Sequence, residues 1–584
     1  MKRSICFPAL LLLTGILVPI LGACVPLSPA DTSDGAGIPS PSSADTSHSG
    51  IVYYDISIEM NPARGIFRSQ QRISITGRLA VGRKLSIFIG GGLVVDALTL
   101  EDDAGNNLPI TQWQEVNRNT TDNWWGKSVT SEIEILAAEE IPREGLLKVK
   151  LAYHLPPEAI QGGLAGNIYN LFVSTLGSHA GGPESGAFPM VSGSLEAPFT
   201  MTITHPNTFL CAVPGEAVSR EETDGFVTDT YRAEVPYDPS FSCAPYNVMS
   251  KEIQSLRFEI FMPEQVHLSP QMLDTAAGIL SLYREKFGEP SARSFRIVFP
   301  HMLDNAGGGE SNGNLVFLSN VQPYLKYDED ETARDMFDHL VAHEGYHLWN
   351  AWSLTWEGNL TEWWVEGGAN FMASWVKETL YGDEAGANNR LRYLKAYDEQ
   401  EISRCKGCLA NLDNSCSNNW ILVYDYGALV WEQMRQKVGS EAMLAGLRDF
   451  YKSHRNQKTG YDDLITSMQK YTDVDVAAYL EQWIQHNARI NLIVRKVTIQ
   501  PMNGGFEVQV ELETDADRDY ELSTALGCKT STEEDWHLID VHLVRRGQYR
   551  LEFKSNERPL EIQIDPEYRV PRIDLDDNVW SRVP

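Results

Sequence analysis

Residues 336–350, which read MFDHLVAHEGYHLWN, decide how the middle of this 584-residue chain folds. Apolar residues recur there at helical spacing, so the stretch predicts a helix that continues to about residue 352. His343 and His347 are four residues apart and share one face of that helix, where both imidazoles can reach one metal ion. Glu344 lies about 100° around the helix from His343 and can face a water molecule on that ion.

Glu366 supplies the third ligand that such a site needs. It belongs to residues 363–370 (WWVEGGAN), and eighteen residues separate it from His347. A second helix packed antiparallel to the first can bring this carboxylate to the ion, which leaves the fourth position open for water. HExxH alone occurs by chance in many proteins, but this spacing predicts one Zn²⁺ per chain, held by His343, His347 and Glu366.

These residues resemble those of the gluzincin aminopeptidases, which have a thermolysin-like catalytic domain. Residues 343–350 (HEGYHLWN) match the HExxHxWN of the glycyl aminopeptidase family. The spacing and the WxxEG are shared with the aminopeptidase N and leukotriene hydrolase family, but the HLWN favours the glycyl aminopeptidase branch. The likeness is specific over residues 306–427 and by architecture covers residues 51–584.

The resemblance implies a substrate-binding stretch ahead of the metal ligands. Both families have a glycine-rich segment whose backbone lies against the substrate and whose Glu meets the substrate's α-ammonium. Gly308, Gly309 and Glu310 match it here, followed by Ser311 where the families have His or Asn. A mobile glycine loop is the alternative interpretation.

The resemblance also implies a tyrosine that donates to the oxyanion. Tyr424 matches the Tyr of the families' YxKG motif, with Tyr426 in place of the Lys, although either tyrosine could be helix packing. Asn370, one turn after the third ligand, is a weaker candidate for a partner of a metal-binding His. His339 as a fourth ligand would block the open position, so we interpret it as a neighbouring or surface residue, and His301 as packing or a substrate contact.

Three regions follow one another along the chain. Short alternating runs predict an amino-terminal β-sandwich over residues 51–260, and alternation returns over residues 488–584, which predicts a carboxy-terminal β-sandwich. Between them, residues 261–487 predict a thermolysin-like, mostly helical catalytic domain with a small sheet, so the fold class is multidomain α+β. The expected helices after residue 331 cover 332–352, 361–381, 385–403, 420–438, 440–453, 462–471 and 474–485.

The first fifty residues predict a targeting segment rather than a folded domain. A basic start and a short apolar run interrupted by proline are typical of a secretory signal peptide. The run ends in Leu-Gly-Ala-Cys, which resembles the bacterial lipobox, so residues 1–24 predict a lipoprotein signal in which Cys24 is acylated. Residues 25–50 contain seven Ser and four Pro and predict a disordered tether.

This resemblance implies a protein of the bacterial cell envelope, attached to a membrane through the lipid on Cys24. An outer-membrane position, facing the periplasm or the surface, is the default expectation. An ordinary signal peptide with a coincidental Cys is the alternative.

Charge and cysteine content limit the remaining partners. Lys plus Arg number 49 and Asp plus Glu 79, so the formal charge is 49 − 79 = −30, which argues against nucleic-acid binding. The spacing of Cys405 and Cys408 predicts a local disulfide or clip, because no second CxxC accompanies it. The pairing of the body cysteines is left open by the sequence: Cys211, Cys243, Cys405, Cys408, Cys416 and Cys528.

The sequence therefore predicts a zinc metallopeptidase that acts on peptides, and the resemblance implies an aminopeptidase. Glu344 is expected to act as general base and Tyr424 to stabilise the oxyanion. A zinc endopeptidase on the same scaffold and a non-catalytic envelope binding protein are the alternatives. The preferred N-terminal residue, the physiological substrate and the oligomeric state do not follow from the sequence.

Overall fold

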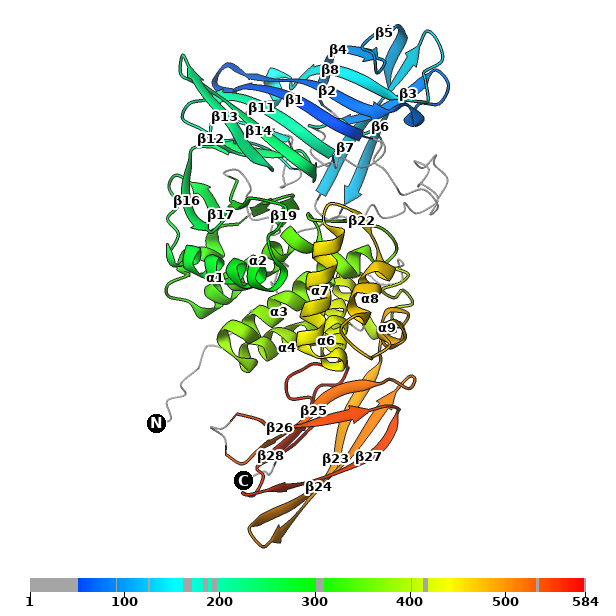
Figure 1. The fold of residues 1–584 in the computed structure, drawn as a ribbon. Helices are drawn as coiled ribbons and strands as arrows, with labels where there is room; N and C mark the ends of the chain where they lie inside the picture. Colours follow the sequence, from blue (N-terminus) through cyan, green and yellow to red (C-terminus); the bar gives the residue numbers. More distant parts are fainter. Residues whose placement is uncertain are drawn as a thin grey trace, which may run out of the picture.

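Three parts follow one another along the molecule in the computed structural model (Figure 1). Sheets come first, a mostly helical part lies in the middle, and sheets return at the carboxyl end, so the predicted multidomain α+β architecture is confirmed. The structure describes residues 51–581, apart from 91, 124–125, 161–170, 182–186, 192–196, 301–308, 319, 401, 413–418 and 532–534. The predicted signal, Cys24 and the tether lie outside the described residues.

The amino-terminal part is built from three sheets around one apolar core. Side chains alternate between buried and exposed along the strands, as in β1, whose Tyr54, Ile56 and Ile58 are buried. The eight-stranded sheet is, in spatial order, β13 (Glu216–Thr223), β14 (Phe226–Tyr237), β11 (Ala197–Pro206), β1 (Ile51–Asn61), β2 (Ile66–Thr76), β8 (Leu146–His154), β4 (Val94–Glu101) and β5 (Asn107–Leu108). The smaller sheets are β3 (Lys84–Gly90), β7 (Gly126–Ala137) and β6 (Ile110–Asn123), and β12 (Leu210–Ala212), β15 (Phe241–Ala244), β10 (Ser178–Ala180) and β9 (Leu171–Val173).

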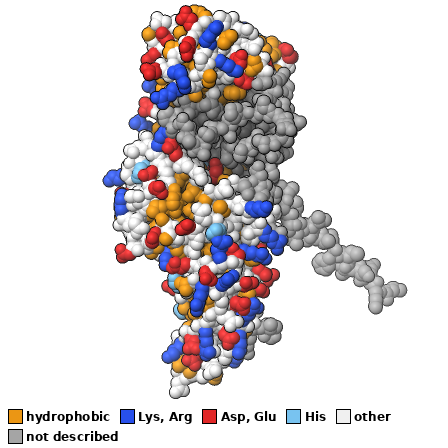
Figure 2. Space-filling view, turned by 90° about the vertical axis from the view of Figure 1, so that its right-hand side faces the viewer, with side chains coloured by type: hydrophobic (Ala, Val, Ile, Leu, Met, Phe, Trp, Pro, Cys, Tyr) orange, Lys and Arg blue, Asp and Glu red, His pale blue; other side chains and the backbone are white. Residues whose placement is uncertain are grey.

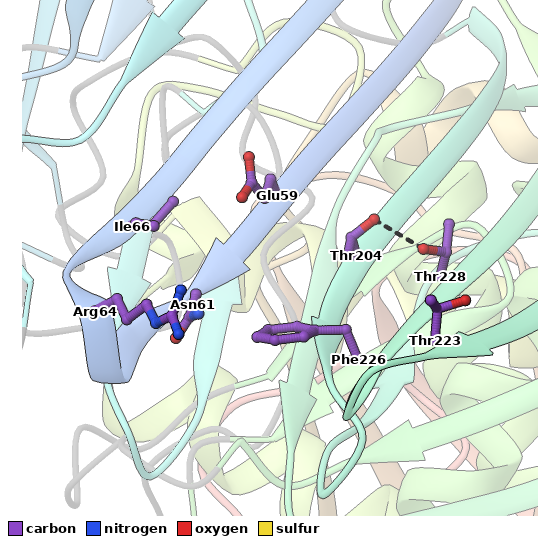
Figure 3. A pocket seen from close by; sticks show the side chains of 8 residues that line it. All are labelled: Glu59, Asn61, Arg64, Ile66, Thr204, Thr223, Phe226 and Thr228. Carbon is purple, nitrogen blue, oxygen red and sulfur yellow. Dashed lines mark hydrogen bonds between the residues drawn. The ribbon is translucent and has the colours of Figure 1, made fainter.

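Two local features mark this part. A disulfide joins Cys211 of β12 to Cys243 of β15, which are paired neighbours with Cα atoms 4.0 Å apart. A pocket opens on the eight-stranded sheet, where Thr204 and Thr228 are hydrogen-bonded at 2.9 Å and Phe226 projects toward Asn61 (Figure 3). All the residues that line this pocket come from β1, β2, β11, β13, β14 and the turn after β1.

The central part has a five-stranded sheet covered by helices. Its strands are β16 (Tyr246–Ile253), β17 (Leu256–Pro263), β18 (Ser294–Val298), β20 (Leu315–Leu318) and β19 (Gly309–Asn312), with β19 at the edge. A two-stranded sheet pairs β21 (Thr355–Trp356) with β22 (Lys458–Thr459). The sequence pattern alone assigned β16 and β17 to the amino-terminal region, but these strands pair into the sheet of the central part.

Helices follow the expected ranges closely, but two of them contain a π-helical turn that the sequence did not predict. Trp363–Gly367 (η6) precedes α3, and Leu422–Tyr426 (η8) precedes α6. The α-helices are α1 (Gln271–Phe287), α2 (Glu331–Asn350), α3 (Gly368–Tyr381), α4 (Asp383–Glu399), α5 (Asn419–Ile421), α6 (Gly427–Val438), α7 (Ser440–His454), α8 (Tyr461–Gln469) and α9 (Val476–Ile484).

The carboxy-terminal part consists of two sheets. One contains β23 (Ile490–Met502), β24 (Gly505–Ala516) and β27 (Gly547–Ser555), and the other contains β26 (His537–Leu543), β25 (Leu522–Lys529), β28 (Glu561–Ile564) and β29 (Val579–Ser581). Its apolar core is continuous with that of the central part, since both contribute to one cluster of buried residues. The two parts are therefore packed as one body.

Buried charges also join the central and carboxy-terminal parts. Glu432 of α6 is 2.8 Å from Arg435 on the same helix and 2.9 Å from Arg569 of the carboxy-terminal part. Arg390 of α4 donates to the backbone oxygen of Glu567 at 2.9 Å. Since buried charges are tolerated only when they are paired, this network fixes how the two parts dock.

The molecular surface is mixed in charge on the face that Figure 2 shows. Basic side chains are interspersed with acidic ones over its upper and lower regions, and hydrophobic side chains gather in the middle. Among the described residues, no helix has the length and apolar character needed to span a bilayer.

Candidate metal centre

Helix α2 positions the two histidines. Asp330 caps its first turn by accepting a hydrogen bond from the backbone N–H of Thr332 at 2.9 Å. From Phe337 onward every residue of α2 is buried, so the helix runs through the centre of the part rather than over its surface. His343 and His347 are 0% and 2% exposed, on one face of this buried helix.

The structure brings His343, His347 and Glu366 together. The two Nε2 atoms are 3.2 Å apart, and Oε2 of Glu366 lies 3.2 Å from Nε2 of His343 and 3.6 Å from Nε2 of His347. Zinc bonds of about 2.0–2.1 Å at a tetrahedral angle separate two ligand atoms by about 3.3–3.4 Å. The three side chains therefore fit one such ion without rearrangement.

Two asparagines set the tautomer of both histidines. Nδ1 of His343 lies 2.9 Å from Oδ1 of Asn370, and Nδ1 of His347 lies 3.1 Å from Oδ1 of Asn350. A carbonyl oxygen can only accept, so each Nδ1 carries the proton and each Nε2 presents a lone pair to the shared space. This pairing of a metal-binding His with an outer acceptor is usual around zinc.

Asn350 is a site residue whose role the sequence analysis missed. Its Nδ2 donates to the backbone oxygens of Trp364 and Val365 at 3.1 and 2.8 Å, which fixes the amide so that Oδ1 faces His347. One side chain thus orients a ligand on α2 and holds the turn that carries Glu366. Its position one turn after His347, within the quoted HLWN, was the signal that could have identified it.

Glu366 completes the donor set as a carboxylate. Burial raises the pKa of Glu366 and a positive charge beside it lowers that pKa, so the carboxylate form is favoured when a cation occupies the space between it and the two imidazoles. Both of its carboxylate oxygen atoms are buried and lack a hydrogen-bond partner, and the residue is 0% exposed. Buried carboxylates that lack hydrogen bonds are normally paired with a cation, which fits a metal at this position.

The two π-helical turns place Glu366 and Tyr424 beside each other. A Cβ added at Gly367 would lie 2.8 Å from the backbone oxygen of Val423 and 3.1 Å from the carbonyl carbon of Gly427, so the turns touch through backbone atoms. The ring of Tyr424 stacks on that of His343, with centroids 6.0 Å apart and an interplanar angle of 7°. Single π-turns of this kind are frequent at functional sites because they redirect side chains.

The predicted general base lies at the same place. Glu344 is 1% exposed and adjacent in α2 to His343. Burial raises the pKa of the Tyr324 phenol, and the nearby charge of Glu344 raises it further. Glu344 is therefore inside the buried centre and not on the solvent side of the helix.

The glycine-rich stretch is described only in part. Gly309 and Glu310 belong to the edge strand β19, where Glu310 is opposite Phe317 of β20. Trp352, just after α2, donates from Nε1 to the hydroxyl of Ser311 at 3.3 Å, so β19 lies close to the end of the histidine helix. Gly308 and His301 lie outside the described residues.

Other candidates take up different positions. The hydroxyl of Tyr426 is buried 2.7 Å from the backbone oxygen of His486 and 2.9 Å from that of Trp483, so Tyr426 packs away from the metal cluster. His339 is buried one turn from His343, with ring centroids 6.1 Å apart. Cys405 is disulfide-bonded whereas Cys408 is a buried free thiol, so these two do not form the predicted clip with each other.

Comparisons with known proteins agree with this geometry. Residues 272–483 match the family model described as Peptidase family M1 domain. The chain is 25% identical over 227 residues to aminopeptidase N of Lactococcus lactis subsp. lactis, covering 36% of this chain and 26% of that protein. It is 23% identical over 228 residues to aminopeptidase N of Streptomyces lividans, covering 37% of this chain and 23% of that protein.

A solved structure shares the fold. The aminopeptidase A of Legionella pneumophila, determined in complex with aspartic acid, superposes with a TM-score of 0.65 over 90% of this chain and 59% of that one, at 16% identity. The matched region spans about a quarter of the length of the curated relatives.

Proposed function

We propose, from the premise that residues 272–483 form an M1 peptidase domain, that this chain is a zinc-dependent aminopeptidase. The observation that carries the proposal is the buried cluster of His343, His347 and Glu366, whose donor atoms lie within 4.8 Å of one another. Both Nε2 atoms and the Glu366 carboxylate present lone pairs to one point. Two histidines and one carboxylate are the donor set of a catalytic zinc with one open position.

The protein groups around that position have separate tasks. When bound, Zn²⁺ supplies a Lewis acid that polarises the scissile carbonyl and lowers the pKa of water. Glu344 takes the proton of the attacking water and later delivers it to the leaving amine. Tyr424 donates its phenolic proton as a hydrogen bond to the developing oxyanion, and its place beside His343 supports this role.

Glu310 anchors the α-ammonium of the substrate and makes the enzyme remove one residue at a time. Its strand β19 is the edge of the sheet, next to the end of α2. A charge-assisted contact of this kind contributes about 1.5–3 kcal/mol, so Glu310→Ala lowers kcat/KM for free-amino substrates by about 10- to 150-fold. The alternatives are a zinc endopeptidase, which lacks this anchor, and a non-catalytic envelope binding protein.

One experiment tests the activity. Purified zinc-loaded enzyme is given aminoacyl amides and matched N-acetylated peptides, with and without chelator. Glu344→Gln keeps the metal and loses turnover on all substrates, whereas Glu310→Ala keeps the metal and loses only the preference for a free amine. Equal cleavage of free and acetylated peptides by the native enzyme favours the endopeptidase, and no hydrolysis by metal-loaded protein favours the binding protein.

We also propose that the chain belongs to the glycyl aminopeptidase branch and is anchored to a membrane. The HLWN at residues 347–350 supports the glycyl aminopeptidase branch. The site takes one Zn²⁺ per chain. Acylated Cys24 and the tether that follows it hold the enzyme at a bacterial membrane, with the outer membrane as the default. The net charge of −30 supports a peptide rather than a nucleic acid as the partner.

A further inference from the structure

The pocket on the eight-stranded sheet lies outside the metal centre and has a volume of about 300 Å³. This is at the lower end for small-molecule sites, which occupy about 300–1,000 Å³. Its side chains share one face of the sheet, since Glu59 lies opposite Thr204 and Thr204 opposite Thr228. Their neighbours Ile58 and Ile203 are buried on the other face, so the pocket is on the solvent side of the sheet.

Asn61 is a nearly buried polar group in this pocket. It precedes the short turn Pro62–Arg64 (η1), where an asparagine usually caps the backbone, but its side chain makes no capping hydrogen bond. Asn61 is 9% exposed, and its amide has no hydrogen-bond partner among the described residues. A buried amide that is left unpaired is unfavourable, so Asn61 has both a donor and an acceptor to offer to a ligand.

Two opposite charges line the same pocket. Glu59 of β1 and Arg64 of η1 are both exposed, and within the described part of the chain neither has an oppositely charged partner closer than 4.0 Å. Arg68 lies opposite Glu59 on β2 but forms no ion pair with it within that distance. The pocket thus combines an acceptor in Glu59 with a donor in Arg64, and these two charges cancel.

Phe226 gives the pocket an aromatic wall. Its side chain is partly buried, and Figure 3 shows the ring reaching toward Asn61 from the side opposite Arg64. Thr223 of β13 lies directly opposite Phe226 and adds a hydroxyl group. An aromatic ring in this position can stack on the apolar face of a flat ligand while the polar groups bind its rim.

This combination excludes several kinds of ligand. An apolar molecule would remove water from Glu59 and Arg64 without replacing their hydrogen bonds, and a simple anion or cation would meet a like charge. A peptide strand cannot pair with the backbone here, because β1, β2, β11 and β14 are hydrogen-bonded to a neighbour on both sides. A neutral molecule with donors and acceptors around its rim remains, as does a small zwitterion.

Hydroxyl groups continue from the pocket across the sheet, which favours the neutral molecule. Two residues further along the strands, a row of hydroxyl side chains crosses β1, β11, β14 and β13: Ser57, Thr202, Thr230 and Ser219. The hydroxyls of Thr202 and Thr230 are 3.3 Å apart, and none of the four residues is fully buried. A ligand longer than one ring can therefore leave the pocket over groups that both donate and accept.

We propose that this pocket binds a neutral sugar ring of an oligosaccharide. The ring stacks on Phe226, and its hydroxyl groups bind Asn61 and the two charged side chains. Each sugar hydroxyl both donates and accepts, so it pairs equally well with an amide, a carboxylate and a guanidinium. The pocket belongs to the amino-terminal part and the metal ligands to the central part (Figure 1), so a bound saccharide leaves the metal centre open.

The test is direct binding of neutral oligosaccharides to the purified protein. Maltotriose, cellotriose and tri-N-acetylchitotriose are titrated to about 10 mM, above the millimolar Kd expected of one stacked ring and a few hydrogen bonds. Saturation-transfer NMR and calorimetry should show saturable binding of at least one of them. Phe226→Ala and Asn61→Ala should each weaken it about 5- to 10-fold, and Arg64→Ala about 2- to 5-fold.

Trp113→Ala is the matched control. Trp113 is another exposed aromatic residue, 39% exposed, on β6 of a different sheet, so its removal should leave the binding unchanged. Thermal melting checks that each variant is folded. Arg64 is exposed on a turn, so Arg64→Ala tests the pocket even if Phe226→Ala or Asn61→Ala fails to fold.

Three results overturn the inference. The first is the absence of saturable binding of all three saccharides. The second is an affinity that is equal in the native protein and in every folded pocket variant, or that falls only in Trp113→Ala. The third comes from alanine and phenylalanine, titrated as zwitterionic probes: if these bind and the saccharides do not, the pocket takes free amino acids instead.

Discussion

Gly367 is the point where the metal centre has the least room, and replacing it with alanine tests how the two π-helical turns position Glu366. The new Cβ would lie 2.8 Å from the backbone oxygen of Val423, whereas ordinary contacts begin at 3.4 Å. Since a backbone oxygen cannot rotate away, one turn must move by about 3.4 − 2.8 = 0.6 Å. Metal–ligand distances tolerate shifts of only about 0.2 Å.

Glu366 directly precedes Gly367, so this displacement acts on a metal ligand. We expect Gly367→Ala to weaken zinc binding by at least about tenfold, in the range reported for disturbed ligand support. Overpacking should also destabilise the fold by about 1–3 kcal/mol, offset by up to about 1 kcal/mol because alanine favours a helix over glycine. Both glycines at this junction have helical dihedral angles, with φ −62° at Gly367 and −63° at Gly368, so backbone strain does not contribute.

Gly368→Ala is the matched control. Its Cβ would meet Nδ2 of Asn350 at 3.4 Å, an ordinary contact, so this variant should bind zinc normally and melt at or slightly above the native temperature. Zinc affinity is measured by competition with a chromogenic chelator, and stability by thermal melting with and without metal. If both variants behave alike, the contact between the two turns does not position Glu366 and the argument fails.

Three further predictions concern other parts of the molecule. Asn350→Ala removes the acceptor of His347 and should weaken zinc binding by about 10- to 100-fold in the same competition assay; unchanged affinity would show that the amide has no such role. Glu432→Gln should destabilise the protein by about 3 kcal/mol at pH 7, the lower end for a broken buried pair, because Arg435 and Arg569 lose one carboxylate but keep Glu378 and Glu567. Burial alone would raise the pKa of Glu432, but Arg435, Arg569 and Arg390 lower it to about 2. The carboxylate therefore stabilises the fold when the pH is above the ordinary pKa of a glutamate. This contribution is lost as the pH falls toward 2. The difference in melting temperature between native protein and Glu432→Gln should therefore narrow from pH 5 to pH 3, and a constant difference would contradict the assignment. Cys24→Ala should release the protein from membranes or block its maturation, as fractionation would show, whereas unchanged membrane association would indicate an uncleaved signal.

The metal cluster was accessible from the sequence because its geometry is mostly local. The spacing of His343 and His347 follows from the helical period, and Glu366 needs only a second helix packed on the first. The regions of strand and helix were predictable for the same reason, since buried positions recur with period 2 or 3.6. These features depend on residues that are close in sequence.

What the sequence did not indicate depends on contacts between distant segments. The π-turns η6 and η8 lie where Gly367 contacts Gly427, and the periodicity of the sequence does not predict such a contact. The sheet that β17 joins is decided by its packing against β18 and not by the alternation of its residues. The sequence pattern therefore placed β16 and β17 with the preceding strands. The role of Asn350 follows from backbone partners 14 and 15 residues away.

Helix α4 contacts both the carboxy-terminal part and the helix that carries the two histidines. Arg390 reaches the carboxy-terminal part through the backbone of Glu567, while two residues later Arg392 donates to His339, one turn of α2 before His343. A chain cut after residue 487 would remove Arg569, expose Glu432 and Arg435 to water and free one side of this helix. The last hundred residues thus behave like a permanently attached subunit, and we expect the central part to need them to remain folded.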